Sequence, residues 1–385
     1  MNLAEIIGLA ACSAWAYLLF GRGFFWLAQE RDGGATEAPP SPAWPSVVAI
    51  VPARNEADVV ERALSSLLAQ DYAGPFRVIL VDDESTDGTA ALARALQTKV
   101  RAPLEIVTGA PLPPGWTGKL WALSRGLKRA DAGSQPPDFV WFTDADIAHA
   151  QDTLTSLVQR AVGGRLTLVS RMAKLRVETW HERLLIPAFV FFFAMLYPFA
   201  WVNDASSRTA GAAGGCMLVR RDALRAAGGL EAIAADIIDD CALAARMKRQ
   251  GPIWLGLATG SVSLRPYARL GDIAQMVTRS AYAQLKFSPL LLAGGVAGMA
   301  LVYLSPALLT VFARGPARLA GAISWLAMAL AFQPMLRFYR RSPFWGLALP
   351  LIGSLYGLFT VISAVEVRRG RGGMWKGRAQ AAVRP

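Results

Sequence analysis

The chain has 385 residues, of which 54% are hydrophobic, and its mean hydropathy of +0.33 argues against a wholly water-soluble protein. Two histidines and three scattered cysteines argue against a zinc site and a disulfide framework. The net charge of +12 comes without a zinc-finger, RNA-binding or basic-helix pattern, so we expect no nucleic-acid partner. Two groups of basic residues instead lie beside apolar runs: Arg337, Arg340, Arg341; and Arg368, Arg369, Arg371, Lys376, Arg378. Attraction to anionic headgroups explains them, which makes the lipid bilayer a predicted partner.

The first apolar run extends from Leu3 to Phe20, interrupted only by Glu5 and followed by Arg22. A cleaved signal peptide would have Lys or Arg before its apolar run, and here none precedes it. The sequence therefore favours an uncleaved transmembrane anchor over residues 1–28. Residues 29–45 are rich in Gly, Pro and Ala, which indicates a linker.

From Ser46 onward, strand-like and helix-like segments alternate. The expected strands cover residues 47–51, 77–81, 104–107, 139–143 and 166–170. The expected helices cover residues 58–69, 88–96, 119–130 and 152–162. This rhythm predicts an α/β domain over residues 46–288, with a mostly parallel, doubly wound, Rossmann-like sheet. Such a sheet binds its ligands at the carboxyl ends of the strands.

Acidic pairs stand at two of these strand ends, Asp82 and Asp83 after the second strand and Asp144 and Asp146 after the fourth. A later pair, Asp239 and Asp240, leads into a helix. Carboxylates splayed around one point suit a hard divalent cation, Mg²⁺ or Mn²⁺, which shares its oxygen ligands with substrate phosphates. His149 follows the second pair, and we expect it to be a local hydrogen-bonding residue. The segment Gly211–Met217 precedes the third pair, and its small residues either permit close approach of a sugar or form a tight connection.

Two further segments carry polar groups near the same edge of the sheet. Pro52, Arg54 and Glu56 follow the first strand, a position suited to binding a nucleoside. Lys119 follows Gly118 at the start of a helix, where it could meet phosphate. The alternatives are that Asp83–Gly88 only turns the chain and caps a helix, and that Lys119 is a solvated lysine.

Three more apolar runs, residues 290–312, 319–336 and 344–365, predict a C-terminal transmembrane region over 289–366 with two or three spans. A basic tail follows over 367–385. If all three runs span, the tail lies opposite the α/β domain, against the positive-inside tendency. Either the run with Gly346, Pro350, Gly353 and Gly357 is re-entrant, or the tail lies outside.

The uncharged run 184–202 is also long enough to span a membrane. If it spanned, Asp144 and Asp240 would lie on opposite sides of the bilayer. Pro187 and Pro198 also argue against a regular span. We therefore expect an interfacial, acceptor-side helix whose aromatic side chains lie at the lipid-headgroup boundary.

These motifs together resemble the inverting glycosyltransferases of family 2. That family carries a P-x-x-N-E start, a D-D-x-S-x-D-x-T turn, a G-K helix, a D-x-D metal motif and a later E-D pair. The resemblance runs from about Ser46 to Ser288. It implies a GT-A-like domain, a nucleotide diphosphate-sugar donor, commonly a UDP-sugar, and Mg²⁺ or Mn²⁺ as cofactor.

The resemblance also implies roles for the donor-binding residues. Those that would contact the donor are Pro52, Arg54 and Glu56 in the nucleoside pocket, Asp82 or Asp83 at the base, and Lys119 at the diphosphate.

By the same resemblance, the remaining acidic residues would bind the metal or take part in catalysis. Asp144 would contact the ribose or the metal, and Asp146 would be the principal metal ligand. Asp240 falls on the position of the catalytic base. Asp239 stands beside it where the family usually has Glu.

Related processive and ceramide-directed members carry a Q/R-x-x-R-W element after the acidic pair. Gln284 and Lys286 are the nearest match here, with different spacing and with Lys-Phe in place of Arg-Trp, which argues against polymer synthesis. We expect Gln284 and Lys286, together with Trp180 and Phe192, to contact the acceptor or the diphosphate.

The chain also resembles the hopanoid-biosynthesis-associated glycosyltransferases of bacteria. The segments that carry this resemblance are Trp116–Trp121, Thr143–His149, Leu184–Asp204, Ile237–Cys241 and Gly370–Arg378. It implies transfer of a hexosyl or N-acetylhexosaminyl group to a hopanoid or similar lipid, by a multi-pass protein of the bacterial inner membrane with its catalytic domain facing the cytoplasm. The alternatives are a ceramide-like or polyprenyl-phosphate acceptor, or a non-catalytic membrane scaffold that binds nucleotide-sugars.

Overall fold

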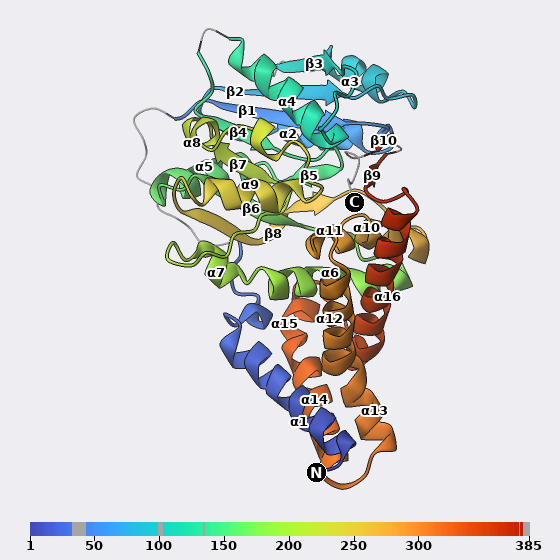
Figure 1. Ribbon diagram of the computed structural model, residues 1–385. Helices are drawn as coiled ribbons and strands as arrows, with labels where there is room; N and C mark the ends of the chain where they lie inside the picture. Colours follow the sequence, from blue (N-terminus) through green and yellow to red (C-terminus); the bar gives the residue numbers. More distant parts are fainter. Residues whose placement is uncertain (33–43, 99–102, 134, 377, 380–385) are drawn as a thin grey trace. The chain divides into compact units, whose positions relative to one another are not determined.

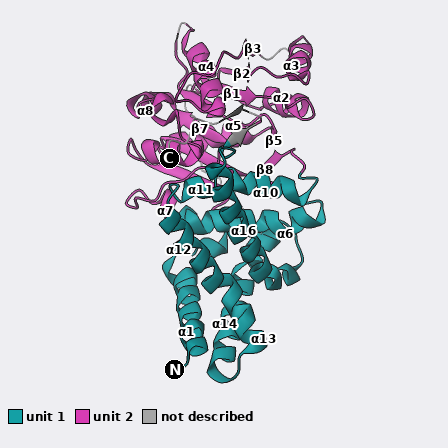
Figure 2. Cartoon of the chain, turned by 45° about the vertical axis from the view of Figure 1, so that its right-hand side comes forward, with its two compact units in different colours: residues 1–29, 177–200, 267–373 teal, residues 30–176, 201–266, 374–385 magenta. Residues whose placement is uncertain are grey.

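A computed structural model of the chain describes residues 1–32, 44–98, 103–133, 135–376 and 378–379 (Figure 1). The chain forms two compact units (Figure 2). Unit 1 comprises residues 1–29, 177–200 and 267–373, and unit 2 comprises residues 30–176, 201–266 and 374–385. The predicted domain 46–288 thus contributes residues to both units. Most of the predicted linker, and residues 377 and 380–385 of the predicted tail, lie outside the described residues.

Unit 2 is built on a mixed sheet with the strand order β3-β2-β1-β4-β7-β6-β8-β5. The strands are β1 Val47–Ala53, β2 Phe76–Asp82, β3 Leu104–Thr108, β4 Phe139–Phe142, β5 Ile147–His149, β6 Leu168–Lys174, β7 Met217–Arg220 and β8 Ile253–Ser263. The pairs within β3-β2-β1-β4 are parallel, as is the β6–β8 pair. Strand β7 is antiparallel to β4 and β6, and β5 is antiparallel to β8. The predicted α/β architecture is confirmed, and β5, β7 and β8 are additional to the five predicted strands.

Helices cover both faces of this sheet, which explains why β1 is buried along its whole length (Figure 1). The helices of unit 2 are α2 Val60–Leu68, α3 Thr89–Gln97, α4 Gly118–Asp131, α5 Thr153–Gly163, α8 Arg221–Ala226, a 3₁₀ turn at Glu231–Ile233 and α9 Asp239–Met247. Helix α7, Phe199–Asn203, crosses the boundary between the units. Helix α4 packs closely on β1, because a Cβ atom on Gly126 would lie 2.4 Å from Ile50 Cγ2.

Unit 1 is helical in its described residues. Its elements are α1 Leu3–Ala16, a π-helical turn Tyr17–Gly21, a 3₁₀ turn Phe25–Leu27, α6 Trp180–Leu196, α10 Leu270–Thr278, α11 Ala281–Gln284, α12 Pro289–Met299, a π-helical turn Ala300–Leu304, α13 Ser305–Phe312, α14 Gly315–Ala331, α15 Gln333–Phe338, a 3₁₀ helix Pro343–Ala348 and α16 Leu349–Arg368. Four segments are long and apolar enough to cross a membrane: Leu3–Gly21, Pro289–Phe312, Gly315–Phe338 and Pro343–Arg368. They correspond to the four predicted runs.

The last of these segments folds back on itself. Gln333 Nε2 donates to the carbonyl oxygen of Pro343 at 3.1 Å, and Trp325 Nε1 donates to that of Leu347 at 3.1 Å. Because Trp325 lies about two helical turns before Gln333, residues 343–347 run backwards along α14 before α16 begins.

Helix α16 then runs in the opposite direction to residues 343–347, back toward the end of unit 1 at which α15 ends. A Cβ atom on Gly353 would lie 2.6 Å from the ring of Tyr303, which is midway along the Pro289–Phe312 segment. Ten residues later, Ser363 Oγ accepts a hydrogen bond from Tyr282 N, which precedes that segment. The geometry of unit 1 therefore favours the re-entrant alternative.

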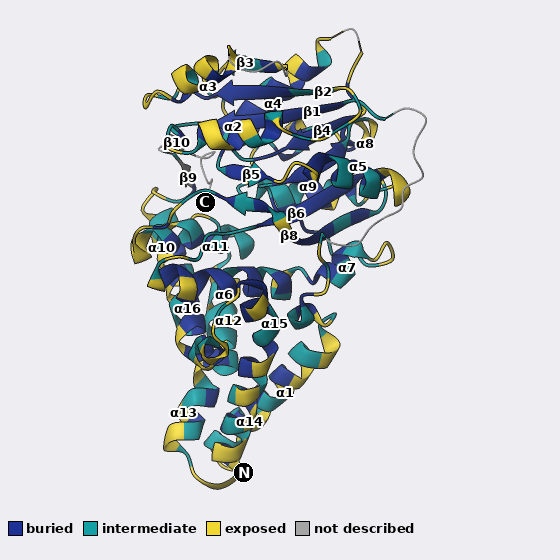
Figure 3. Cartoon of the chain, turned by 180° about the vertical axis from the view of Figure 1, so that it is seen from behind, coloured by how far each residue is buried: buried dark blue, intermediate teal, exposed yellow. Residues whose placement is uncertain are grey.

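Helix α6 corresponds to the uncharged run 184–202. It has 17 residues, contains Pro187 and ends at Leu196. Phe191 packs against Phe25 and Phe332, and Phe192 packs against Tyr303 and Tyr356. The expectation that the aromatic side chains lie at a headgroup boundary is wrong for Phe191 and Phe192, which are buried because neighbouring helices supply aromatic partners. Much of α6 is buried (Figure 3).

We expect Gly126→Ala to destabilise unit 2 even though alanine favours a helix. The new methyl group would overlap Ile50 Cγ2 and press on Val81, so the free energy of unfolding should fall by about 1–2 kcal/mol. Thermal unfolding in detergent would measure this change. Gly271→Ala in α10 is the control, since no atom lies within 4 Å of its added Cβ. Equal midpoints for the two variants would contradict the packing described.

Candidate active site

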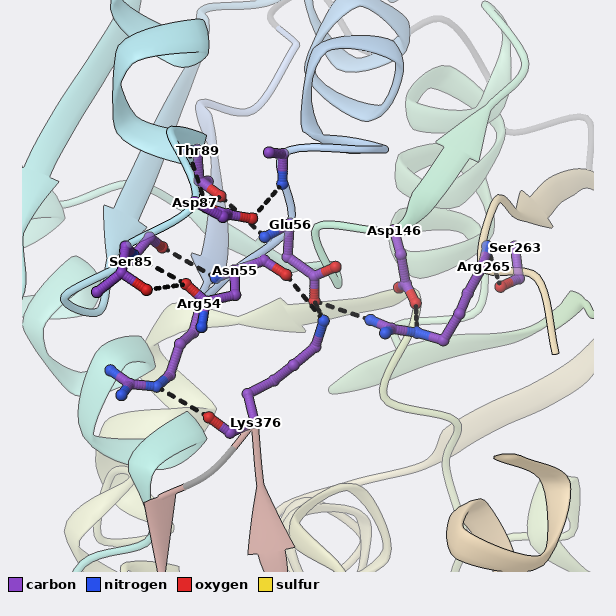
Figure 4. Close-up of polar contacts among 12 residues, drawn as sticks. Arg54, Asn55, Glu56, Ser85, Asp87, Thr89, Asp146, Ser263, Arg265 and Lys376 are labelled. Atoms are coloured by element: carbon purple, nitrogen blue, oxygen red, sulfur yellow. Dashed lines mark hydrogen bonds and ion pairs between the residues drawn. The ribbon is translucent and has the colours of Figure 1, made fainter. Parts of the chain in front are cut away.

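The turns that follow β1 and β2 are tied together by side chains. Asn55 adopts a left-handed backbone conformation, with φ of 52°, and its Oδ1 accepts from Thr86 N at 2.9 Å. Its own N–H donates to Ser85 Oγ at 3.0 Å, and Ala57 N–H donates to Asp87 Oδ2 at 2.9 Å (Figure 4). The polar residues after β2 therefore hold the β1 turn in shape, which is a structural role other than the turn and helix cap that the sequence left open.

The side chains of the first acidic pair are buried at the end of β2. Asp83 is 0% exposed, and Arg54 Nη1 lies 3.7 Å from its Oδ2. Asp82 is 7% exposed, and among the described residues its Oδ1 has no hydrogen-bond partner. Pro52 is buried within β1, in register with Val81. Asp82 thus presents an acceptor that a ligand N–H or hydroxyl could satisfy.

Glu56 and Asp146 are joined by a cation. Arg265 Nη2 lies 2.8 Å from Glu56 Oε1, and Arg265 Nε donates to Asp146 Oδ2 at 2.6 Å. Lys376 Nζ lies 3.1 Å from the same Glu56 oxygen (Figure 4). Burial raises the pKa of the Glu56 carboxyl, and Arg265 and Lys376 only partly oppose this. The sequence analysis did not predict Arg265, which follows β8 without a motif, and it attributed Lys376 to headgroup attraction.

Lys119 is the centre of a second ionic group. Its Nζ lies 2.8 Å from Asp144 Oδ1 and 3.5 Å from Asp239 Oδ2, so it links β4, α4 and α9. Thr117 caps α4 through its Oγ1, which accepts from Leu120 N. Burial alone would lower the pKa of Lys119, but Asp144 and Asp239 raise it well above its usual value. Lys119 is therefore a charged lysine held between carboxylates, with its side chain 16% exposed, rather than a solvated one.

Asp240 lies beside this group at the start of α9. Its Oδ2 accepts from Gly214 N at 2.9 Å, and its Oδ1 accepts from Cys241 N at 2.7 Å. Burial and the neighbouring Asp239 raise its pKa from 3.8 to about 6, while Lys119 opposes the shift. A carboxylate with this pKa can accept a proton near neutral pH. A Cβ atom on Gly214 would lie 3.0 Å from Lys119 Nζ, so a glycine here keeps the space between these groups open.

The residues after β4 offer oxygen ligands for a hard cation. Asp144 pairs with Lys119 through Oδ1, and Asp146 pairs with Arg265 through Oδ2. No group of three His, Cys, Asp or Glu residues that could hold a metal occurs in the described part of the chain. A divalent ion would fit here by sharing these two carboxylates with the phosphates of a ligand, as Mg²⁺ commonly does.

His149 does not belong to that donor set. Its Nε2 lies 2.8 Å from Thr143 Oγ1 and its Nδ1 lies 2.9 Å from Ser261 Oγ. Burial and Arg171 lower its pKa to about 3, so it is a neutral local hydrogen-bonding residue, as expected.

The four predicted acceptor residues belong to unit 1, whereas the groups above belong to unit 2. Gln284 Oε1 accepts from the Tyr197 hydroxyl at 2.9 Å, and Lys286 has a left-handed backbone with φ of 52°. Trp180 is 63% exposed at the start of α6, while Phe192 is buried. Their role in binding an acceptor stays a prediction, and the burial of Phe192 leaves it little surface for that role.

Comparison with known proteins identifies a family for part of the chain. Residues 48–228 match the family model described as Glycosyl transferase family 2. An N-acetylglucosaminyltransferase of Azorhizobium caulinodans is 29% identical over 193 residues, which are 48% of this chain and 46% of that protein. One from Mesorhizobium japonicum is 30% identical over 167 residues, covering 42% of this chain and 37% of that protein. The chain thus spans less than half the length of these curated relatives.

A solved structure extends the likeness over nearly the whole chain. The mannosyltransferase PcManGT from Pyrobaculum calidifontis, solved in complex with GDP-Man and Mn²⁺, is similar with a TM-score of 0.57. The match covers 98% of this chain and 100% of that chain, at 22% identity. At this identity the likeness shows the fold, and it confirms the predicted GT-A-like α/β class.

The raised pKa of Asp240 predicts a specific pH dependence of stability. A carboxyl whose folded pKa exceeds its unfolded value stabilises the fold below the unfolded pKa, and this contribution is lost as pH rises through the folded value. Between pH 4 and pH 7 we expect the free energy of unfolding of the wild-type chain to fall by about 2–3 kcal/mol relative to that of Asp240→Asn. Unfolding of both proteins across this range measures the difference, and parallel pH profiles would contradict it.

Proposed function

We propose that this chain, whose residues 48–228 match glycosyltransferase family 2, transfers a sugar from a nucleotide diphosphate-sugar to a membrane lipid. The observation that carries the proposal is the cluster of Lys119, Asp144, Asp239 and Asp240. It joins a partly buried cation suited to phosphate, a strand-end carboxylate suited to a metal, and a carboxylate whose pKa suits a general base. These three functions are what the transfer of a glycosyl group from a diphosphate requires.

The donor would lie across the ends of β1, β2 and β4. Asp82, with its orphaned Oδ1, and Asp83 would accept hydrogen bonds from the base, and Pro52, Arg54 and Glu56 would line the nucleoside pocket. Lys119 would exchange its carboxylate partners for diphosphate oxygens. We propose a UDP-hexose or UDP-N-acetylhexosamine as donor, and the relatives named N-acetylglucosaminyltransferase support the latter.

Asp146 would be the main protein ligand of Mg²⁺ or Mn²⁺, with Asp144 beside it. A bound ion supplies positive charge that stabilises the leaving diphosphate. Arg265 holds the Asp146 carboxylate in place through its Nε.

The chemistry follows from the position of Asp240. As the acceptor hydroxyl forms a bond to the anomeric carbon, the bond from that carbon to the diphosphate oxygen breaks. Asp240 takes the hydroxyl proton, and Lys119 neutralises charge on the departing phosphate. A single displacement of this kind inverts the anomeric centre. Asp239 would serve by holding Lys119 and by raising the pKa of Asp240.

The four apolar segments of unit 1 support a lipid acceptor. The resemblance to hopanoid-associated enzymes makes a hopanoid or similar polycyclic alcohol our proposed acceptor, with ceramide-like and polyprenyl-phosphate lipids as alternatives. Because residues 343–368 fold back, the basic groups at 337–341 and 368–371 lie at one end of unit 1. The positive-inside tendency then favours a cytoplasmic location for that end, in a bacterial inner membrane.

We expect Asp240→Asn to lower turnover by about 10²- to 10⁴-fold while leaving donor binding intact, because it removes only the proton acceptor. The assay would combine lipid-reconstituted protein, Mn²⁺, UDP-, GDP- and dTDP-sugars and bacterial lipid extract. Mass spectrometry would read the glycolipid, and Asp222→Asn, an exposed site, is the control. Saturable donor binding without any product in wild type would instead favour the scaffold alternative.

We expect metal removal to weaken nucleotide binding as well as activity. The dissociation constants of UDP measured by calorimetry with Mn²⁺ and with EDTA should differ by about tenfold in wild type, because Asp146 would hold the ion and the ion would supply positive charge for the nucleotide phosphates. In Asp146→Asn the increase in UDP affinity caused by Mn²⁺ should largely disappear, whereas the exposed control Asp152→Asn should retain it. An undiminished Mn²⁺ effect in Asp146→Asn would rule out Asp146 as the main ligand.

A further inference from the structure

A short β-hairpin follows the last apolar segment of the chain. Its strands are β9, Met374–Trp375, and β10, Arg378–Ala379, which pair antiparallel. Five residues, 369–373, connect it to α16. From the sequence, this region was predicted to be a basic tail attracted to headgroups. Within unit 2, however, Lys376 has a defined set of partners.

Lys376 contacts three consecutive residues after β1. Its Nζ lies 3.1 Å from Glu56 Oε1 and donates to the carbonyl oxygen of Asn55 at 3.0 Å. Its own carbonyl oxygen accepts from Arg54 Nε at 3.2 Å (Figure 4). Backbone and side chain of one residue thus hold the turn that the proposed function assigns to the nucleoside.

The charge of Lys376 balances this part of the site. Glu56 is 8% exposed and shares Arg265 with Asp146. Without Lys376, two carboxylates would share one guanidinium, and the group would carry a net negative charge. An anionic diphosphate donor would be repelled by such a group, because charges interact more strongly where water is excluded. With Lys376 present, the four side chains are formally neutral.

We propose that Lys376 is a donor-positioning residue, and that the segment after α16 completes the donor site by bracing the Arg54–Glu56 turn and cancelling the charge of Glu56. This inference rests on the proposed function. It gives the segment beyond the last apolar helix a role in binding a soluble nucleotide, in place of one at the lipid surface.

The test compares Lys376→Met with Lys376→Arg, and uses Arg371→Met, at an exposed basic residue of the same segment, as the control. UDP and GDP binding would be measured by calorimetry with Mn²⁺, beside KM and kcat for the donor. Lys376→Met should weaken nucleotide binding and raise the donor KM about tenfold, with kcat within about twofold of wild type. Lys376→Arg should recover most of this loss, and Arg371→Met should behave as wild type.

A double-variant cycle separates positioning from general damage to the fold. Because Lys376 acts partly by neutralising Glu56, Lys376→Met should weaken binding less in a Glu56→Gln background than in wild type. Thermal unfolding reports whether each variant is folded.

Unchanged binding and KM in folded Lys376→Met would overturn the inference, as would a fall in kcat alone or a failure of Lys376→Arg to rescue. If the wild-type protein bound no nucleotide and transferred no sugar, the proposed function itself would fail. Normal wild-type binding with an unaffected Lys376→Met would reject only the role of Lys376.

Discussion

The candidate site depends on one ammonium group that lies among carboxylates. Lys119 reaches Asp144 at the end of β4 and Asp239 at the start of α9, and Asp240 lies next to it. Three carboxylates gathered in this space would repel one another strongly without a cation, because the local dielectric is low. Lys119 allows them to coexist, and through them it fixes the positions of α4 and α9 against the sheet. Arg265 does the same for Glu56 and Asp146. The site is thus organised as two cation-centred groups.

The different environments of these carboxylates suit them to different roles. Asp144 and Asp146 are each paired with a cation, and their carboxylate oxygens suit a role as ligands of a hard cation. Asp240 lies beside Asp239 and accepts hydrogen bonds from two backbone N–H groups, and desolvation together with Asp239 raises its pKa to about 6. The fold thus holds the Asp240 carboxyl where its charged form is disfavoured, which costs stability. Carboxyl groups with pKa values perturbed in this way are typical of catalytic sites.

The sequence predicted what is local and missed what is distant. Strands β1 to β4 and helices α2 to α5 were expected within a few residues, because their apolar periodicity and turn residues are contiguous in the chain. Strand β5, with three residues, is too short to leave such a pattern. Arg265 could not be inferred, since its partners Asp146 and Glu56 lie 119 and 209 residues away and no motif surrounds it. The buried aromatic residues of α6 were misread because hydropathy cannot distinguish lipid from protein as the apolar surrounding.

The fold-back of residues 343–347 changes how the apolar segments should be counted. Helix α1 runs parallel to α14, since Gly8 lies beside Ala317 and Ala320 while Cys12 lies beside Ala320 and Ser324. If each of the first three segments crosses a bilayer and the fourth returns, the number of crossings is odd. Leu3 and Arg368 then emerge into different compartments, whereas a count of four from hydropathy would assign them to the same one. In that case the parity of the topology would depend on the fold-back of residues 343–347, which the hydrogen bonds from Trp325 and Gln333 hold along α14.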